Sequence, residues 1–91
     1  MTQSLSIKEL FNKAIEDVHK LTSKPSNDEL LNLYANYKQG TVGDVNKPQP
    51  SFYMLKEISK WNAWNNLKGV KKIQAQVNYI KLVENLKKRY N

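Results

Sequence analysis

The sequence predicts an all-α protein of four helices around one core, with a long loop between the second and third helices. Apolar residues recur at spacings of three and four along four stretches, and no stretch of strand length alternates with period two. Two of these stretches begin with the Ser-x-x-Glu pattern that caps helices. With 91 residues, the chain has room for one modest core, so we expect a single domain over residues 1–91.

Two capping boxes mark the starts of the first two helices. The motif SIKE at residues 6–9 places a hydroxyl and a carboxylate where they bond the first amides of a helix, which we expect over about residues 7–21. Pro25 blocks further helix, and the motif SNDE at residues 26–29 begins the second helix, which we expect Gly40 to end. The apolar positions of these two helices are Phe11, Ala14, Ile15, Val18, Leu21, Leu30, Leu31, Leu33, Tyr34 and Tyr37.

The segment from Gly40 to Ser51 predicts a surface loop. Two glycines and two prolines interrupt regular structure there. At about a dozen residues, the loop exceeds the usual connection between helices of a small bundle. A connection of this length can cross the molecule, so the second and third helices can run parallel instead of folding back as a hairpin. We expect such a bundle to leave space between its helices.

Two further helices follow this loop. The third covers about residues 54–67 and stops at Gly69, and the fourth covers about residues 71–90. Trp61 and Trp64 lie three apart on the third helix, so we expect one to face the core and the other to lie near the rim. The other apolar positions are Leu55, Ile58 and Leu67 on the third helix and Ile73, Val77, Ile80, Val83, Leu86 and Tyr90 on the fourth.

The composition argues against catalysis and metal binding. Fifteen Lys and Arg residues against eight Asp and Glu residues give a net charge of +7, which favours anionic partners of any kind. The chain has no cysteine, one histidine and no carboxylates at metal-ligand spacing, so we expect neither catalytic residues nor a metal. The stretch MTQSLSIKEL lacks the apolar region of a signal peptide, and we expect a soluble cytoplasmic protein.

The end of the second helix carries the strongest candidate site. Tyr34, Tyr37 and Lys38 share one side of that helix, which suits a ligand with a flat ring and a phosphate. The alternative is one core tyrosine, one surface tyrosine and a solvated lysine. Lys56 and Lys60, four apart on the third helix, either add charge to the same place or form an ordinary basic surface.

Three motifs resemble the acyl-CoA-binding protein family. They are LYANYKQGTVGD at residues 33–44, KWNAWNNLKG at residues 60–69 and YIKLVENLKKRY at residues 79–90. They stand in the family's order and at similar separations, and the resemblance extends from Phe11 to Tyr90. It implies an up-down-down-up bundle that binds medium- to long-chain fatty acyl-CoA esters, without catalysis and without a cofactor.

The resemblance also implies a set of ligand contacts. In the family, the first motif contacts the nucleotide, and the lysine before the first tryptophan, Lys60 here, contacts the region of the 3′-phosphate. A family lysine on the first helix is replaced by His19, with Lys20 beside it. The implied contacts are His19, Leu30, Leu31, Tyr34, Ala35, Asn36, Tyr37, Lys38, Lys56, Lys60 and Tyr79.

An acyl tail needs an apolar groove, because each methylene left in water forfeits about 0.8 kcal/mol relative to burial. Leu30 and Leu31 lie about a turn before the tyrosines, and we expect Leu55 and Ile58 to wall the groove from the third helix. The segment PSFYML at residues 50–55 is more apolar than its counterpart in the family. We therefore expect this segment to affect the preferred chain length.

Two other kinds of function stay open from the residues alone. A small nucleic-acid-binding module would use the positive charge and stack bases on tyrosines, whereas a purely structural helical adaptor would bind no small ligand. The basic residues are scattered over all four helices and form no nucleic-acid-binding motif, so we expect an acyl-CoA ligand and no nucleic acid. We expect a monomer that makes at most transient contact with membrane surfaces or acyl-CoA-using enzymes.

Overall fold

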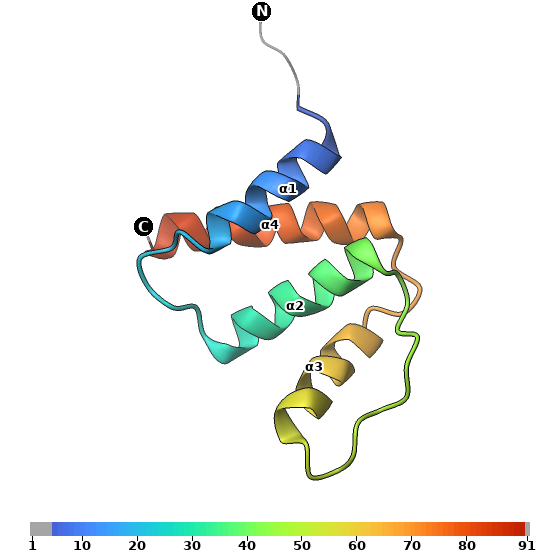
Figure 1. Cartoon of the computed structure of the whole chain (residues 1–91). Helices are drawn as coiled ribbons and strands as arrows, with labels where there is room; N and C mark the ends of the chain where they lie inside the picture. The colour runs from blue at the N-terminus through green and yellow to red at the C-terminus, as the bar shows by residue number, and fades with distance from the viewer. Residues whose placement is uncertain (1–4, 91) are drawn as a thin grey trace, which may run out of the picture.

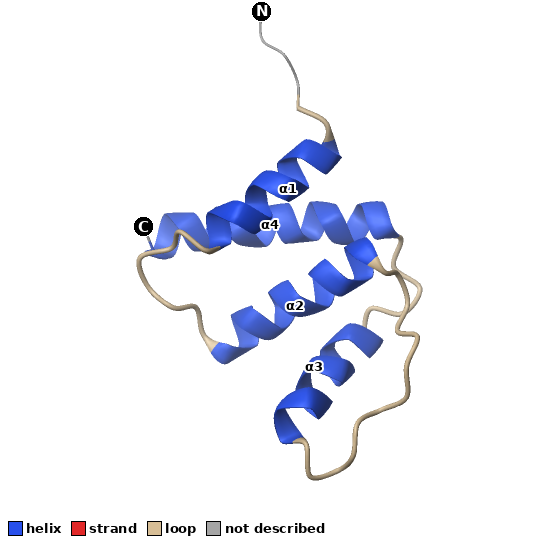
Figure 2. Cartoon of the chain, in the orientation of Figure 1, coloured by secondary structure: helices blue, strands red, loops and turns tan. Residues whose placement is uncertain are grey.

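Four helices form an open bundle in a computed structural model of the chain, which describes residues 5–90 (Figure 1). No strand occurs among these residues, as Figure 2 shows, and the predicted all-α class is confirmed. The helices are α1 (Ile7–Val18), α2 (Asn27–Thr41), α3 (Leu55–Asn65) and α4 (Lys72–Tyr90).

Both predicted capping boxes are present. The Ser6 hydroxyl accepts a hydrogen bond from the Glu9 amide, and the Glu9 carboxylate accepts one from the Ser6 amide, both at 3.1 Å. Ser26 and Glu29 repeat this pair of bonds at 3.2 and 2.8 Å. The four bonds satisfy amides that a helix start leaves without intrahelical partners. At its other end α1 is shorter than expected, because it stops at Val18.

The helices pack in a spatial order that differs from their order in the chain. Within residues 5–90, α4 packs against both α1 and α2, and α3 packs against no helix other than α2. α2 and α3 run in one direction, whereas α1 and α4 run in the other (Figure 1). This is the expected up-down-down-up arrangement, and the long loop allows it.

The core lies where α1, α2 and α4 meet. The rings of Phe11 and Tyr79 pack edge to face, with centroids 5.3 Å apart and an angle of 81° between the planes. Ile73 was expected in the apolar stripe of α4 but is 51% exposed, whereas Ala75 is fully buried. The buried core cluster comprises Phe11, Ala14, Leu33, Tyr79, Val83 and Leu86.

The expectation that Gly40 ends the second helix is wrong, because α2 continues to Thr41. A Cβ atom at Gly40 would lie 3.0 Å from Cγ of Gln76, so the glycine allows α2 and α4 to approach closely. The Gln76 side chain donates a hydrogen bond to the Gly40 carbonyl oxygen at 2.8 Å. The chain turns away two residues after the end of α2, at Gly43, whose φ of 97° suits glycine.

The two tryptophans of α3 hold the long loop against that helix. Trp64 is 1% exposed, and its Nε1 donates to the Gly43 carbonyl oxygen at 2.8 Å. Trp61 is partly exposed, and its Nε1 donates to the Lys47 carbonyl oxygen at 2.8 Å. The expected division into one core and one rim tryptophan is confirmed.

The Gln39 side chain joins the end of α2 to the turn before α4. Its Nε2 donates to Oδ1 of Asp44 at 2.9 Å and to the Val70 carbonyl oxygen at 2.7 Å. The same Asp44 oxygen accepts from the Gly69 amide at 2.8 Å. These bonds, from Gly69 first and Gln39 second, hold the pKa of Asp44 below its ordinary value.

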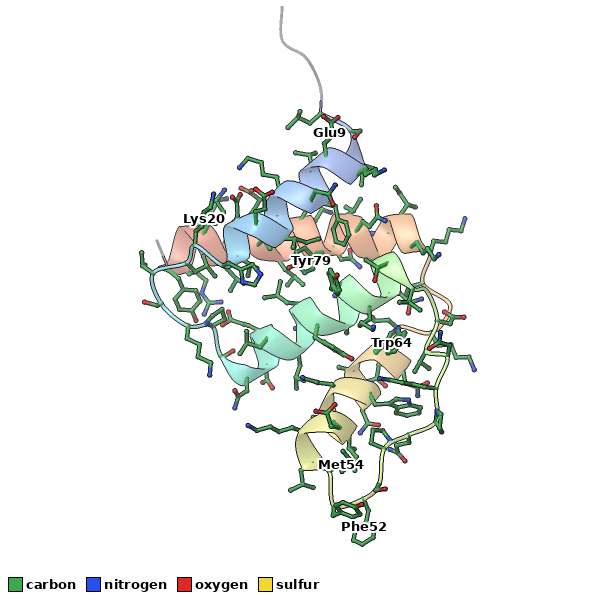
Figure 3. All side chains as sticks on the ribbon, in the orientation of Figure 1. Glu9, Lys20, Phe52, Met54, Trp64 and Tyr79 are labelled. Atoms are coloured by element: carbon green, nitrogen blue, oxygen red, sulfur yellow. The ribbon has the colours of Figure 1, made fainter. Side chains whose placement is uncertain are left out.

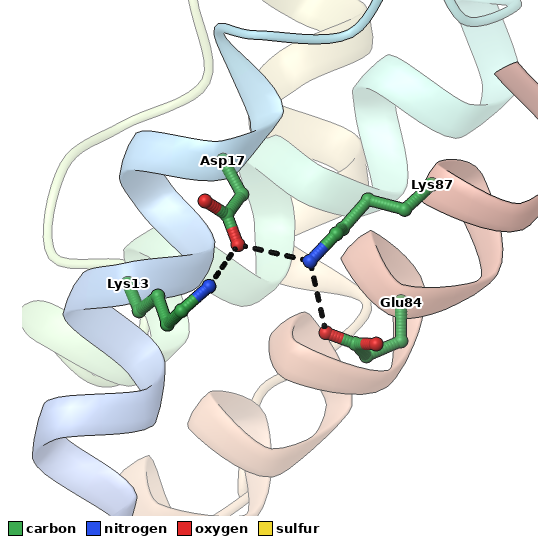
Figure 4. Close-up of polar contacts among 4 residues, drawn as sticks. All are labelled: Lys13, Asp17, Glu84 and Lys87. Carbon is green, nitrogen blue, oxygen red and sulfur yellow. Dashed lines mark hydrogen bonds and ion pairs between the residues drawn. The ribbon is translucent and has the colours of Figure 1, made fainter. Parts of the chain in front are cut away.

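An ion-pair network fastens α1 to α4 (Figure 4). Oδ2 of Asp17 accepts from the ammonium groups of Lys13 at 2.9 Å and Lys87 at 3.1 Å, and Lys87 also lies 3.6 Å from Glu84. The hydrogen bonds from Lys13 and Lys87 lower the pKa of Asp17. The deprotonated carboxylate therefore stabilises the fold above its ordinary pKa, and this contribution disappears as the pH falls through the folded-state pKa.

We predict that Asp17→Asn lowers the urea midpoint of unfolding at pH 7, because it removes the acceptor that Lys13 and Lys87 share. The difference between wild type and variant should close as the pH falls from neutral through the lowered folded-state pKa of Asp17, where the wild-type carboxyl becomes neutral. The exposed Glu16 on the same helix provides the control, and Glu16→Gln should leave the midpoint nearly unchanged at both ends of this range. A difference that persists at the acid end would show that the charge of Asp17 is not what matters.

Candidate functional site: two hollows beside Tyr34

Two hollows of similar size lie on either side of Tyr34. The α1–α2 hollow has a volume of about 410 Å³, and the α2–α3 hollow has a volume of about 420 Å³. Tyr34 and Leu30 line both hollows. The α1–α2 hollow is lined by Ile15, Val18, His19, Pro25, Leu30, Leu33, Tyr34, Tyr37 and Tyr79, and the α2–α3 hollow by Asn27, Leu30, Leu31, Tyr34, Lys56, Ser59 and Lys60.

The α1–α2 hollow is apolar and aromatic. α1 and α2 both pack against α4, and they approach each other through side chains such as Phe11 and Tyr37. The Tyr37 ring centroid lies 6.3 Å from those of Phe11 and Tyr79. Burial, with a smaller effect from neighbouring Tyr37, raises the pKa of Tyr79. The Tyr79 hydroxyl therefore stays protonated at neutral pH and can donate a hydrogen bond.

The α2–α3 hollow combines leucines with two amines. Leu30 and Leu31 contribute apolar surface from α2, and Lys56 and Lys60 contribute positive charge from α3. The Lys60 ammonium lies 5.5 Å from the centroid of the Tyr34 ring, within the range of a cation–π interaction. Such a hollow suits a ligand that has an alkyl part and an anionic part.

Tyr34 is shielded more than a surface tyrosine. Burial first, and the negative charge of Glu57 second, raise the pKa of its hydroxyl. The hydroxyl is thus neutral at physiological pH, and Tyr34 lines both hollows. A ligand that occupied both hollows would have to pass Tyr34.

Lys38 occupies a different position from the two tyrosines of its motif. Its ammonium lies 4.9 Å from the centroid of the Trp64 ring, which it shares with Lys47 at 5.9 Å. Tyr37, the preceding residue, lines the α1–α2 hollow, whereas Lys38 lines neither hollow. The lysine therefore lies on the α3 side of α2, near the long loop.

The structure brings eight of the eleven expected ligand contacts into the two hollows and leaves three outside. Ala35 and Asn36 are 3% and 8% exposed and line neither hollow. The Asn36 amide donates to the Asn32 carbonyl oxygen of its own helix at 2.9 Å. Lys38 is the third. The eight are His19, Leu30, Leu31, Tyr34, Tyr37, Lys56, Lys60 and Tyr79.

Two expectations about the groove wall differ from the structure. Leu55 is 72% exposed, so the expectation that it walls the groove is wrong, and Ile58 lines neither hollow. Residues of α1 and the first interhelical turn line the α1–α2 hollow instead. The helical periodicity identified Ile15 and Val18 as apolar positions, but it carries no information about which apolar positions border an unfilled space.

Neither a metal site nor a membrane span occurs in residues 5–90. No three His, Asp or Glu side chains among these residues are placed to hold a metal ion. Across the same residues, no helix has both the length and the apolar character needed to cross a bilayer. The stretch MTQSLSIKEL begins with residues 1–4, which lie outside the described residues.

The helix order and the two hollows define a class of small helical binding proteins with a site for amphiphilic anions. A family model described as acyl CoA binding protein matches residues 8–83. The chain belongs to the acyl-CoA-binding protein family, so the resemblance seen in the sequence is confirmed.

Relatives and solved structures agree with this assignment. The acyl-CoA-binding protein of Saccharomyces cerevisiae is 46% identical over 85 residues, which cover 93% of this chain and 98% of that protein. The acyl-CoA-binding protein of Dictyostelium discoideum is 48% identical over 80 residues, which cover 88% and 95%. The crystal structure of acyl-CoA-binding protein 2 from Oryza sativa matches with a TM-score of 0.88 and 36% identity, over 92% of this chain and 93% of that chain.

We predict that Tyr79→Ala lowers the free energy of unfolding by about 3 kcal/mol, because it removes a ring that packs in the core. Tyr34→Phe keeps the ring and should change stability by less than about 0.5 kcal/mol, while weakening ligand binding by about 1 kcal/mol through the lost hydroxyl. Urea unfolding and calorimetry on the two variants check this. Equal losses of stability would make Tyr34 a packing residue only.

Proposed function

We propose that the chain binds one medium- to long-chain fatty acyl-CoA ester per monomer and carries it through the cytoplasm, exchanging it with membranes or acyl-CoA-using enzymes. The whole chain, residues 1–91, acts as one acyl-CoA-binding domain. It is a binding protein and not an enzyme, and it uses no cofactor. The observation that carries this proposal is the pairing of an aromatic hollow with a hollow lined by leucines and lysines, joined at Tyr34.

The two ends of an acyl-CoA need different surroundings. The nucleotide needs ring faces, hydroxyl donors and positive charge, and Tyr34, Tyr37 and Tyr79 offer the first two. The alkyl chain needs apolar surface, because each methylene removed from water gains about 0.8 kcal/mol. We place this chain along Leu30 and Leu31 in the α2–α3 hollow.

The amines of α2 and α3 provide for the phosphates. Lys56 and Lys60 line the α2–α3 hollow next to the leucines, and Lys38 lies on the same side of α2. We assign the ribose 3′-phosphate to Lys38 and Lys60, since ammonium groups from two helices gain most by converging on one dianion. His19 lines the α1–α2 hollow and replaces the helix-one lysine contact of the family.

We predict that calorimetry with palmitoyl-CoA gives one site per chain, and that free palmitate binds much more weakly. The reason is that both hollows are open, so an alkyl chain without the charged head leaves the lysines and tyrosines of the site unused. A salt titration accompanies this measurement, because nucleic-acid binding would weaken steeply with salt through counterion release. Palmitate binding as tight as that of the thioester would refute the assignment of the head group.

We predict that Lys38→Ala and Lys60→Ala each weaken palmitoyl-CoA binding about tenfold to a hundredfold, the worth of one charge-assisted hydrogen bond. Lys88→Ala is the control, since this exposed lysine at the end of α4 should change binding by less than about 0.5 kcal/mol. The palmitoyl ester of dephospho-CoA, which lacks the 3′-phosphate, should bind wild type poorly and lose little more in the two variants. Equal losses for both ligands would place these lysines elsewhere on the ligand.

A further inference from the structure

The end of the long loop and the start of α3 carry a cluster of exposed apolar side chains, here called the apolar tip and comprising residues 52–55. Phe52 is 86% exposed, Leu55 is 72% exposed and Tyr53 is 71% exposed, the three highest values for large apolar side chains in the described part of the chain. The rings of Phe52 and Tyr53 lie edge to face, with centroids 5.6 Å apart. Four consecutive apolar side chains left in water are unusual for a small surface loop.

The apolar tip lies at one extremity of the molecule, away from the core. Figure 3 shows Phe52 and Met54 at the end opposite α1, far from Tyr79. The molecule is elongated, with extents of 53 × 29 × 15 Å, so this end can approach a flat surface without obstruction from the rest of the bundle. None of the four residues lines either hollow, and thus neither folding nor the proposed site explains their exposure.

Lysines outnumber acidic residues in the part of the chain that contains the apolar tip. Residues 45–60 contain three lysines, Lys47, Lys56 and Lys60, and one acidic residue, Glu57. The ion pairs found within residues 5–90 involve other lysines, so the charge of these three stays uncompensated by a carboxylate in direct contact. The charge of the tip is therefore complementary to an anionic surface.

We infer that the apolar tip docks the protein on bilayers rich in anionic phospholipid, with Phe52, Tyr53 and Leu55 entering the headgroup layer. Aromatic side chains favour this layer, and shallow insertion of apolar residues combined with nearby lysines is how peripheral proteins bind such bilayers. Lysines gain from the negative potential of the lipid surface, and Lys56 directly follows the inserted side chains in the chain.

A second copy of the chain fits the apolar tip less well than a lipid surface does. Two tips brought together would juxtapose the same three lysines, and like charges repel at an interface. Four side chains also bury far less than the roughly 1,200–2,000 Å² of a specific protein interface. A bilayer requires no shape complementarity and supplies the opposite charge.

Docking through the tip would also place the proposed site beside the lipid. Lys56 directly follows the tip and lines the α2–α3 hollow, so the hollow lies next to the surface that the tip contacts. A role of this docking in ligand exchange rests on the proposed function. Binding to lipid and binding to acyl-CoA are nonetheless measured separately, so that either can fail alone.

The test is co-sedimentation of the ligand-free chain with vesicles of phosphatidylcholine, with or without phosphatidylserine at about a third of the lipid. We expect about tenfold stronger partition onto the anionic vesicles, and about a tenfold loss for the double variant Phe52→Ser, Leu55→Ser. The matched control is Ile73→Ser, which removes another exposed apolar side chain, 51% exposed, from α4 and should bind like wild type. Circular dichroism should show unchanged helix content in all variants, because these side chains are exposed.

Three outcomes would overturn the inference. One is a wild-type chain that stays in the supernatant with anionic vesicles, and another is equal binding by the double variant and wild type. The third is a concentration-dependent dimer, seen by sedimentation velocity without lipid and abolished by the double variant, which would make a second copy the partner of the tip. Calorimetry with palmitoyl-CoA in the absence of vesicles measures the ligand affinity of the double variant separately, so that an effect of residues 50–55 on the acyl chain is distinguished from an effect on docking. Failure of wild type to bind palmitoyl-CoA would instead refute the proposed function.

Discussion

The hydrogen bonds of the buried Gln39 amide hold the two parts of this fold together. In the described part of the chain α3 packs against α2 alone, so its placement also depends on the segments that enter and leave it. Gln39 donates to Asp44 in the loop before α3 and to the Val70 carbonyl oxygen after it, and Asp44 accepts from Gly69 in the same turn. One side chain of α2 therefore ties the beginning of the loop before α3 to the turn after α3. Because a buried amide donor without a partner is costly, these two segments stay together at the end of α2.

The two hollows of the site result from the way in which the helices pack. α4 carries both α1 and α2, which leaves a space between those two helices that the rings of Tyr37 and Tyr79 border and do not fill. On the far side of α1, the Asp17 and Lys87 pair fastens that helix to α4, so the α1–α2 hollow has a fixed wall. A compact antiparallel bundle would have filled both spaces with side chains. The parallel course of α2 and α3, which needs the long loop, is thus the structural reason why a small chain keeps two hollows.

Local sequence rules predicted the helices well and the spaces between them poorly. Capping boxes and hydrophobic spacing depend on neighbouring residues only, which is why the start of α2 at Ser26 follows from the sequence. The prediction for Gly40 was wrong because the role of this glycine depends on Gln76, thirty-six residues away. In the sequence, a glycine that allows a neighbouring helix to approach cannot be told from a glycine that ends its own helix. The prediction for Leu55 was wrong for a similar reason. Its spacing along the helix matches that of core residues, but the first turn of α3 extends beyond the rest of the bundle and leaves Leu55 exposed. The lysines and tyrosines of the site were found through whole motifs, and no local rule would have divided them between two hollows.

Three side chains of α3, all within about three turns of helix, have different roles. Trp64 points inward and bonds the loop backbone, Lys60 lies over the Tyr34 ring beside the hollow, and Leu55 points into solvent. A helix anchored at its C-terminal end by a buried tryptophan can leave its first turn unpacked without loss of placement. The exposed apolar side chains at that first turn are therefore not a defect of packing that the core must offset. They are free to contact a surface, because Trp64 near the other end of α3 fixes the helix to the loop, and Lys56 and Lys60 between these two ends line the α2–α3 hollow.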